Sequence, residues 1–517
     1  MKICLINPPV HGHRIEGYEW SKNAYTIQHL GIGYIAGTLE KYGYETDIIE
    51  APGENLNVKE VCKKLIDGKY DVIGMSTYFF NFINVLRIIK SIIQKLSDTF
   101  IFCGGYLPTL CPREVLDKAK GIDCCMLGEG EYTTLELVQT LERKQDWKKV
   151  AGLAYKENGE IKVTGSREPI RNLDELAFPK RVIINQNFVP LSTSRGCYGM
   201  CNFCGVREFY DICGTERMRF RSPENVVAEM EDVYKRYQPK IFMISDETFF
   251  SGSTKRRDWL ETFYTLLKEK NLPFKFHALA RANDVLRQKD IILKLREVGL
   301  VNVFIGVESF VQRQLDFYKK KTKVKDNVDS LQFLYENNFD VSMGLMMLDP
   351  FTTLDELEEN IKWLRKTKCY SYLDEKQEIF SIDGPVIAIP GTELYSYLEE
   401  HGLLANNDKK YDFQDRQIAV FNDIVEQWRT YVAPVSQKFY LISKANKCGH
   451  LEVEQVLKEK KTQAMLIDIE FMEELCRRIR NNSIESDNCT EFLEEWGKCI
   501  QPVRDDFEDA KKILDGI

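Results

Sequence analysis

The sequence predicts an α/β protein in three parts: a doubly wound Rossmann-like domain, a partial (β/α)6 barrel and a helical C-terminal region. Apolar segments of strand length alternate with amphipathic helical stretches in two separate series, as in parallel sheets covered by helices. A segment with the turn pair Asn158-Gly159 and several prolines separates the two series. After about Gly402 the strand pattern stops and the chain is helical and charged. The expected boundaries are 1–145, 146–189, 190–404 and 405–517.

The first series predicts a parallel sheet in the N-terminal domain. Strands are expected at residues 2–7, 45–50, 71–76, 100–103 and 124–127. Helices are expected at 29–42, 58–66, 131–141 and in a long apolar stretch that ends near residue 96. A hairpin is expected around Asn158-Gly159 in the connector. In a doubly wound sheet the ligand site lies at the carboxyl ends of the strands.

The second series predicts six β/α units, two fewer than a closed barrel needs. Strands are expected at residues 191–194, 241–245, 274–280, 303–307, 341–348 and 378–382. Helices are expected at 223–237, 254–270, 288–298, 325–337 and 353–366. Functional groups in such barrels gather at the carboxyl ends of the strands.

Composition and charge exclude several classes of protein. The net charge of −8 argues against a nucleic-acid partner. Most of that charge lies in residues 451–517, where 17 Asp and Glu face 10 Lys and Arg. We expect this tail to be a packed helix with a solvated acidic face. No apolar run is long enough to span a membrane, and the N-terminus resembles a strand more than an export signal. We therefore expect a cytoplasmic protein whose 15 cysteines do not form disulfides.

Three cysteines stand out by their spacing. Cys197, Cys201 and Cys204 form a CxxxCxxC pattern just after the first predicted barrel strand, with glycines around them that let the backbone curl. A [4Fe–4S] cluster needs four ligands, so three thiolates leave one iron open to a small molecule. The alternatives are a zinc site that borrows a fourth ligand such as Cys213, or simply buried thiols.

This pattern resembles the signature of the radical S-adenosylmethionine (SAM) enzymes, which places an aromatic residue before the last cysteine, as Phe203 is here. The resemblance implies that the cysteines hold a [4Fe–4S] cluster, that SAM binds its open iron, and that Phe203 lies near the adenine. Other segments at predicted strand ends resemble the family's SAM-binding positions. The segment Pro-Gly-Thr-Glu-Leu-Tyr at residues 390–395 resembles a further family segment that follows the sixth strand. The SAM-binding residues implied are Phe203, Ser245, Asp246, Glu247, Arg281, Glu308 and Ser309.

The order of the domains is similar to that of the cobalamin-binding class of radical SAM enzymes. Small residues at the strand ends of the first domain suit a flat macrocycle. The cobalamin-binding residues implied are Pro9, Ser76, Thr77, Gly104, Gly105, Gly128, Glu129 and Gly130. The loop after the first strand lacks the D-x-H-x-x-G motif that supplies an axial histidine, since neither His11 nor His13 has an aspartate two residues before it. We expect His29 to be structural. The resemblance therefore implies cobalamin without a histidine ligand, or a domain that keeps the fold without the cofactor.

The resemblance implies an enzyme, and the leading hypothesis is cobalamin-dependent methylation of an unactivated carbon in a peptide or natural product. The second is oxidative ring or bond formation on a ribosomal peptide or metabolite. The third, of a different class, is a non-catalytic iron–sulfur or cobalamin sensor. Methylthio transfer to RNA is disfavoured because the tail is acidic. The expected partners are the peptide or small-molecule substrate and an electron donor such as ferredoxin or flavodoxin, with no membrane.

Overall fold

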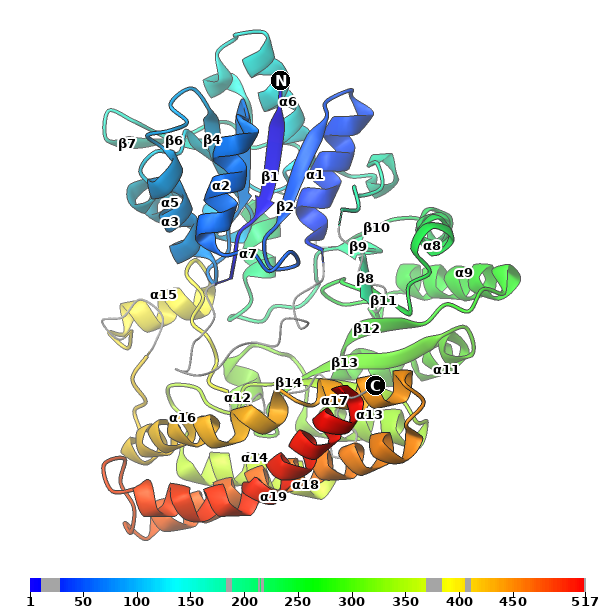
Figure 1. Cartoon of the computed structure of the whole chain (residues 1–517), viewed down its shortest axis with the longest axis vertical. Helices are drawn as coiled ribbons and strands as arrows, with labels where there is room; N and C mark the ends of the chain where they lie inside the picture. The colour runs from blue at the N-terminus through cyan, green and yellow to red at the C-terminus, as the bar shows by residue number, and fades with distance from the viewer. Residues whose placement is uncertain are drawn as a thin grey trace.

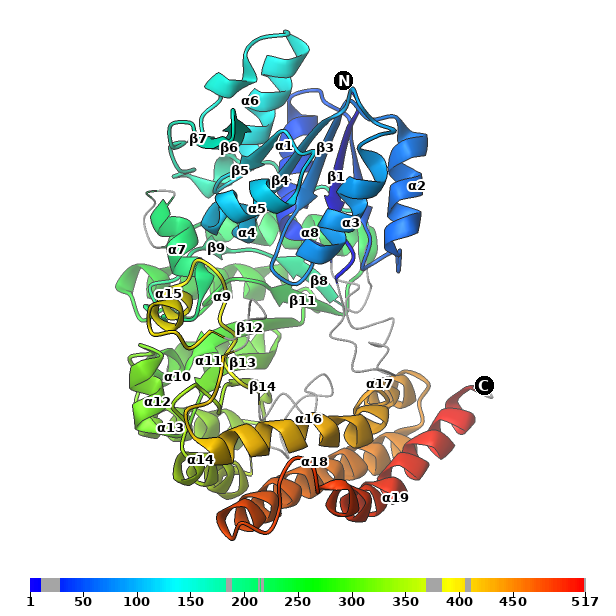
Figure 2. The same ribbon diagram turned by 90° about the vertical axis from the view of Figure 1, so that its left-hand side faces the viewer.

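The computed structural model describes residues 1–10, 28–182, 188–212, 214, 218–368, 384–404 and 411–515. The N-terminal sheet domain lies at one end of the long axis, the barrel in the middle and the helical region at the other end (Figure 1). The view turned by 90° shows the same order (Figure 2). The predicted α/β class and the sequence of the three parts are confirmed.

Seven strands form the N-terminal sheet in the order β2-β1-β3-β4-β5-β6-β7. Five are parallel: β1 (Ile3–Asn7), β2 (Thr46–Glu50), β3 (Val72–Ser76), β4 (Phe100–Gly104) and β5 (Cys124–Met126). The predicted hairpin forms β6 (Leu153–Glu157) and β7 (Glu160–Val163), which extend this sheet antiparallel at its edge. The strand order reverses between β1 and β3, and this is the point where doubly wound sheets bind ligands.

Strand β1 shows why helices cover both faces of this sheet. Successive side chains of a strand point to opposite faces, so Ile3 and Leu5 pack in one apolar core while Cys4 and Ile6 pack in another. Helices α1 (Leu30–Lys41) and α6 (Glu131–Glu142) complete the first core. Helices α2 (Val58–Gly68), α3 (Phe82–Ile92) and α5 (Pro112–Lys118) complete the second. Helix α3 ends at Ile92, and turns carry the chain on to residue 96.

The described part of the barrel contains a five-stranded parallel sheet in the order β14-β13-β12-β11-β8. The strands are β8 (Phe188–Leu191), β11 (Ile241–Ile244), β12 (Phe276–Arg281), β13 (Leu300–Glu308) and β14 (Asp340–Leu345). The covering helices are α8 (Pro223–Tyr237), α9 (Thr254–Lys270), α11 (Lys289–Glu297), α13 (Val324–Glu336) and α14 (Leu354–Thr367). The strand predicted at 378–382 lies outside the described residues.

The first predicted barrel strand is divided in the structure. Strand β8 ends at Leu191, and β9 (Ser194–Arg195) pairs antiparallel with β10 (Arg219–Phe220). The buried carboxylate of Asp246 accepts hydrogen bonds from the backbone N–H groups of Thr193 and Ser194, at 2.7 and 3.1 Å. These bonds replace the sheet ladder at this point, so the chain turns before the cysteine motif.

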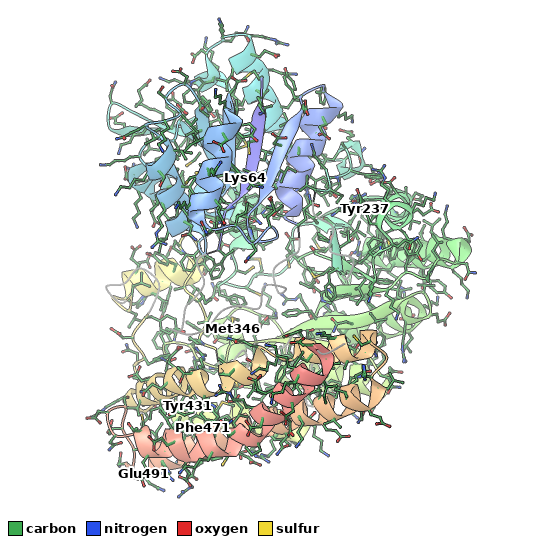
Figure 3. All side chains as sticks on the ribbon, viewed as in Figure 1. Lys64, Tyr237, Met346, Tyr431, Phe471 and Glu491 are labelled. Atoms are coloured by element: carbon green, nitrogen blue, oxygen red, sulfur yellow. The ribbon has the colours of Figure 1, made fainter. Side chains whose placement is uncertain are left out.

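The helical region packs on the outer helices of the barrel. It consists of α16 (Arg416–Ser436), α17 (Tyr440–Lys447), α18 (Leu451–Arg480) and α19 (Thr490–Asp515), and its apolar residues share one core with α13 and α14. Trp428 is buried, stacks on Phe471 with ring centroids 4.4 Å apart, and donates to Asp468 at 2.8 Å. Tyr431 and Phe471 lie in this helical layer (Figure 3). The acidic tail is therefore a packed structure, as expected. No helix in the described part of the chain is long and apolar enough to cross a membrane.

Replacing Trp428 by Ala is expected to lower the free energy of unfolding by about 3–5 kcal/mol, because it leaves a cavity in this core and removes the hydrogen bond to Asp468. Denaturant titration measures the loss. The control is Tyr440→Ala on α17, a side chain 37% exposed, whose removal should cost less than about 1 kcal/mol. Equal losses from the two variants would contradict the assignment of Trp428 to the core.

Candidate active site

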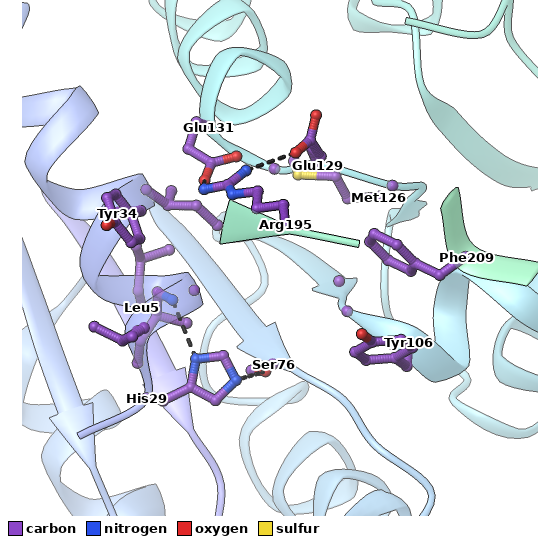
Figure 4. A pocket seen from close by; sticks show the side chains of 18 of the residues that line it. Leu5, His29, Tyr34, Ser76, Tyr106, Met126, Glu129, Glu131, Arg195 and Phe209 are labelled. Atoms are coloured by element: carbon purple, nitrogen blue, oxygen red, sulfur yellow. Dashed lines mark hydrogen bonds and ion pairs between the residues drawn. The ribbon is translucent and has the colours of Figure 1, made fainter. Parts of the chain in front are cut away.

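A cavity of about 380 Å³ lies where the carboxyl ends of the N-terminal strands face the barrel (Figure 4). Both domains line it. The first domain contributes Ser76, Gly104, Gly105, Gly128, Glu129 and Gly130, all predicted from the sequence as cobalamin-binding. The barrel side contributes Ser194, Arg195, Phe209, Tyr210, Ser245 and Glu247. Pro9 and Thr77 are buried but are not among the described residues that line it.

The four predicted glycines of this lining, Gly104, Gly105, Gly128 and Gly130, are there for different physical reasons. Gly105 and Gly128 have positive φ angles of 103° and 73°, which side chains with a Cβ rarely adopt. A Cβ on Gly130 would lie 2.7 Å from Ile35 Cδ1, so the end of the Ile35 side chain would have to move to admit it. A Cβ on Gly104 would meet only Met126 Cβ, at 3.6 Å. The protein could therefore accept a side chain at position 104, and its absence leaves space in the cavity.

His29 is both structural, as expected, and part of the cavity wall. It caps helix α1, because its Nδ1 accepts a hydrogen bond from the backbone N–H of Ile32 at 3.2 Å. An accepting Nδ1 assigns the ring proton to Nε2, which contacts Ser76 Oγ at 3.1 Å and Tyr78 OH at 2.5 Å. Removal from water lowers the pKa of His29 to about 4, so the ring is neutral at pH 7. Its second nitrogen is thus already used inside the protein. His11 and His13 lie outside the described residues.

An aromatic wall, consisting of Tyr106 and Phe209, joins the two domains inside the cavity. Tyr106 begins the short helix α4 (Tyr106–Leu110) of the first domain, and Phe209 lies on α7 (Gly205–Ile212) of the second. Their ring centroids are 4.8 Å apart. Helix α7 starts directly after Cys204, so the wall is continuous with the cysteine loop. Sequence reasoning missed this wall because its two halves are about 100 residues apart in the chain.

A buried network of charges, the Arg195 network, fixes the barrel to the first domain. Arg195 Nη1 lies 2.7 Å from Glu129 Oε1, and its Nη2 lies 2.5 Å from Glu131 Oε1. Arg219 donates to both oxygens of Glu129, each at 2.9 Å. Burial alone would raise the pKa of Glu129, but the two guanidinium groups lower it below its usual value, so this carboxylate is charged. Glu129 lines the cavity, as predicted for a cobalamin-binding residue, while its carboxylate is held by arginines of the barrel.

The three cysteines lie on the loop between β9 and α7. Cys197 Sγ accepts from the N–H of Gly199 at 3.3 Å, and Cys201 Sγ accepts from Arg281 Nη1 at 3.5 Å. Burial raises the pKa of Cys197, and it raises that of Cys204 to about 12, with the neighbouring cysteines adding to both shifts. Buried thiolates need positive charge nearby, which the iron ions of a cluster and the Arg281 guanidinium provide. This donor set fits an iron–sulfur cluster.

A single metal ion fits this loop less well. Within the ranges described above, no three His, Cys, Asp or Glu side chains are close enough to hold one ion. The thiolates of a [4Fe–4S] cluster each bind a different iron, so they need not meet at one point. Cys213, the alternative fourth ligand, lies outside the described residues.

Four of the seven predicted SAM-binding residues divide into two groups. Asp246 and Ser309 are fully buried and use their side chains within the fold: Asp246 holds Thr193 and Ser194, and Ser309 contacts Gln314 and Asn360. Ser245 and Glu247 line the cavity.

Among the described acidic residues predicted to bind SAM, Glu247 is the one that lines the cavity. Its Oε2 accepts from the N–H of Gly196 at 3.2 Å, beside the cysteine motif. Burial raises its pKa to about 7, so the side chain changes charge near neutral pH. Phe203, which precedes the last cysteine of the motif, packs edge-on against Tyr318 with ring centroids 5.7 Å apart.

Two protein-family models match this chain, one in the N-terminal domain and one in the barrel. A family model described as the B12 binding domain matches residues 21–138, and one described as the radical SAM superfamily matches residues 191–364. The chain is 26% identical over 455 residues to an uncharacterized methyltransferase of Pyrococcus horikoshii. This alignment covers 85% of the present chain and 93% of the methyltransferase. It is 27% identical over 382 residues to the anaerobic magnesium-protoporphyrin IX monomethyl ester cyclase of Rubrivivax gelatinosus. This alignment covers 71% of the present chain and 66% of the cyclase.

A solved structure shares the fold over the whole chain. The cobalamin-dependent S-adenosylmethionine radical enzyme OxsB, with aqua-cobalamin and S-adenosylmethionine bound, matches with a TM-score of 0.75 and 18% sequence identity. The match covers 100% of this chain and 81% of that one.

Replacing Arg195 by Met is expected to destabilise the protein by about 3–5 kcal/mol, because Glu129 and Glu131 lose a charge partner in a buried place. The free energy of unfolding, from denaturant titration, measures the effect. The matched control is Arg171→Met, which removes an ion pair whose side chains are 84% and 87% exposed and should change stability by less than about 1 kcal/mol. Wild-type stability in the Arg195 variant would show that the network does not hold the domains together.

Proposed function

The chain belongs to the radical SAM superfamily and carries a B12-binding domain, and from this premise we propose that it methylates an unactivated carbon of a peptide or natural product. The radical SAM domain implies a [4Fe–4S] cluster and SAM, and the B12-binding domain supports cobalamin as the third cofactor. The protein is an enzyme. What remains to be proposed is the reaction and the class of substrate.

One observation carries the proposal: residues predicted to bind the two cofactors line a single cavity. Gly104 and Gly105 are on its first-domain side, and Ser245 and Glu247 are on its barrel side. Methyl transfer to a carbon radical requires the methyl donor and the radical source to face the same substrate atom. A shared cavity between the domains meets this requirement.

The overall reaction balances with two molecules of SAM and two electrons. When bound, the cofactors supply a methyl group from cobalamin and a 5′-deoxyadenosyl radical from the cluster and SAM. For each substrate C–H bond replaced by C–CH₃, one SAM leaves as S-adenosylhomocysteine and the other as methionine and 5′-deoxyadenosine. The hydrogen removed from the substrate ends on 5′-deoxyadenosine. An external donor such as ferredoxin or flavodoxin supplies the two electrons.

The roles of the protein's own residues follow from their surroundings. Cys197, Cys201 and Cys204 would hold the cluster, with Arg281 stabilising negative charge on Cys201. The deprotonated form of Glu247 would accept from the SAM ammonium group, since it is an acidic side chain on the cavity wall next to the cysteine motif.

One feature of the cavity bears on the substrate. The aromatic wall of Tyr106 and Phe209 would shield one side of the cavity from water. Radical intermediates need such protection from side reactions. An apolar wall of this kind suits a carbon-rich group, which supports a peptide side chain or a natural product as substrate. A cytoplasmic setting suits reduced thiols and a low-potential electron donor.

Oxidative ring or bond formation is the second candidate, supported by the likeness to the cyclase of Rubrivivax gelatinosus. The two candidates differ in their products. Ring formation gives 5′-deoxyadenosine and a product two mass units lighter than the substrate, without S-adenosylhomocysteine.

Anaerobic purification with metal analysis, followed by product analysis, tests the proposal. We expect about four irons and one cobalt per chain. With substrate, we expect S-adenosylhomocysteine and 5′-deoxyadenosine in equal amounts. The product should be about 14 mass units heavier than the substrate, because replacing H by CH₃ adds one CH₂.

In the Cys197→Ala variant the rate of 5′-deoxyadenosine formation should fall at least 100-fold, whereas Cys499→Ala, which changes an exposed cysteine, should keep the wild-type rate. Iron without cobalt favours ring formation. Full biological activity of Cys197→Ala would contradict the radical mechanism and support a sensor, and zinc without iron would exclude both methylation and ring formation.

Replacing Gly104 by Leu is expected to reduce bound cobalt at least tenfold, because the new side chain would occupy space in the cavity, where its Cβ makes only an ordinary contact with Met126 Cβ at 3.6 Å. Iron content and melting temperature should stay as in the wild type. Gly165→Leu is the control, since a Cβ at this exposed loop position outside the cavity meets nothing within 4 Å. A Gly104→Leu variant that keeps one cobalt per chain would place cobalamin elsewhere.

A further inference from the structure

A lysine-rich turn, residues 319–325, follows α12 (Gln312–Phe317) and runs into the start of α13. It contains five lysines and no acidic residue, and the function proposed above makes no use of it. The lysines at positions 319, 321, 323 and 325 are exposed, whereas Lys320 and Thr322 between them are buried. The alternation directs four of the five ammonium groups to solvent. Like charges repel one another, so stability alone does not favour such a run.

Part of this charge is neutralised by the protein itself. Lys319 and Lys325 each form an ion pair with a carboxylate. Lys320 is paired inside the barrel with Glu308. Lys321 and Lys323 form no ion pair with any residue that the structure describes. Two exposed positive charges on this turn are therefore available to a partner.

A surface hollow of about 440 Å³ opens beside these two lysines. Arg287, at the end of α10 (Ala282–Arg287), adds a third cation to its lining. Two carboxylates also line it, and both are used within the fold: Asp326 accepts from the backbone N–H of Lys323 at 2.8 Å, and Asp316 accepts from a glutamine side chain at 2.9 Å. Figure 2 shows α10, α12 and α13 along one outer edge of the barrel. The hollow is thus lined by more cations than acids, in a protein whose net charge is −8.

The lysine-rich turn is held in a fixed shape. The side chain of Gln312 donates to the carbonyl of Thr322 and accepts from the N–H of Val324, each at 3.2 Å. The backbone at Lys319 and Lys321 is left-handed, with φ angles of 52° and 55°, which reverses the direction of the chain. A fixed turn presents its charges in a constant arrangement and loses little freedom when a partner binds.

The turn packs directly on the cysteine loop. The backbone carbonyls of residues 317 and 318 accept from the side chain and the N–H of Asn202, at 2.7 and 3.2 Å. The carbonyl of Lys320 accepts from Arg281 Nη2, and Arg281 Nη1 contacts Cys201 Sγ at 3.5 Å. Two polar contacts therefore connect the backbone of this turn to a cysteine that would hold the cluster.

The turn is not part of the active-site cavity. None of its residues is among the described residues that line that cavity, and the hollow and the cavity share no lining residue in this part of the chain. A partner bound at the turn would leave the cavity open to substrate. The proposed reaction needs both at once, because electrons must reach the cluster from outside. Electron transfer slows steeply with distance, so the donor has to dock close to the cysteine loop.

We propose that the lysine-rich turn is the docking surface for an acidic one-electron donor protein, whose carboxylates face Lys321, Lys323 and Arg287. It rests on the proposed function in one respect, since it assumes a [4Fe–4S] cluster on the cysteine loop. In each encounter the donor is oxidised by one electron and the cluster is reduced by that electron, with no bond made or broken in this protein. Complexes of electron-transfer proteins are small, so opposite charges act mainly on the rate of association, and salt weakens them.

The test mixes fully reduced flavodoxin, an acidic donor, with the anaerobically reconstituted protein in a stopped-flow spectrometer. Lys321→Glu combined with Lys323→Glu reverses the charge of both unpaired lysines. Lys59→Glu combined with Lys498→Glu is the matched control, since it makes the same change at exposed lysines of α2 and α19. The absorption of the flavodoxin semiquinone reports electron transfer directly, without substrate or turnover. Reduction by dithionite verifies in each variant that the cluster is present and reducible.

We expect the second-order rate constant for reduction by flavodoxin to fall by about tenfold or more in the Lys321 and Lys323 variant, and to stay within about twofold of wild type in the control. The wild-type rate constant should decrease as the ionic strength rises from about 0.05 to 0.5 M, and that of the variant should change much less. Reduction by dithionite and the melting temperature should be the same in all three proteins.

Equal rate constants in the wild type and the Lys321 and Lys323 variant would overturn the inference. So would a wild-type cluster that dithionite reduces and flavodoxin does not. A variant that flavodoxin reduces normally but that binds its substrate more weakly would assign the turn to an acidic segment of the substrate instead. A wild-type protein without a reducible cluster would reject the proposed function as well. One that flavodoxin reduces but that transfers no methyl group would reject methylation and leave the docking surface standing.

Discussion

The position of Arg195 in both the chain and the fold determines how the two domains meet. It lies two residues before Cys197, and its guanidinium group is held by Glu129 and Glu131 at the strand ends of the first domain. Arg219 reinforces this arrangement by gripping the same Glu129 carboxylate with two hydrogen bonds. A buried charge with two partners tolerates little displacement, because each lost contact leaves a charge in a medium of low polarity. The start of the cysteine loop is therefore fixed relative to the cavity.

The acidic residues around the site divide the work between structure and chemistry. Asp246 turns the chain after β8, and Glu129 and Glu131 hold Arg195, so these carboxylates are satisfied by the protein itself. Glu247 and Glu308 are different. The first faces the cavity with a pKa raised by burial, and the second is held in strained backbone against Lys320. Groups whose surroundings are costly to maintain are the ones expected to meet a ligand.

Much of the fold could be predicted because apolar periodicity is a local property of the chain. The helices at 223–237 and 254–270 begin and end where their caps and apolar faces predict. The first barrel strand was predicted as one segment, because nothing in residues 191–194 reveals that Asp246, more than fifty positions later, would take their backbone N–H groups. The site follows the same rule. The cysteines and glycines are visible as motifs, whereas His29 and Tyr106 acquire their importance only from neighbours that folding brings to them.

Helix α7 gives the two halves of the site a common mechanical element. It starts at Gly205, immediately after Cys204, and it carries Phe209 into the cavity against Tyr106. A helix is stiff over two turns, so an adjustment of the cysteine loop is transmitted to the cavity wall. Any ligand that prefers one position of this helix changes the affinity for a ligand at its other end, and by the same factor in both directions. Occupation of the cysteine loop and occupation of the cavity would therefore be coupled through α7.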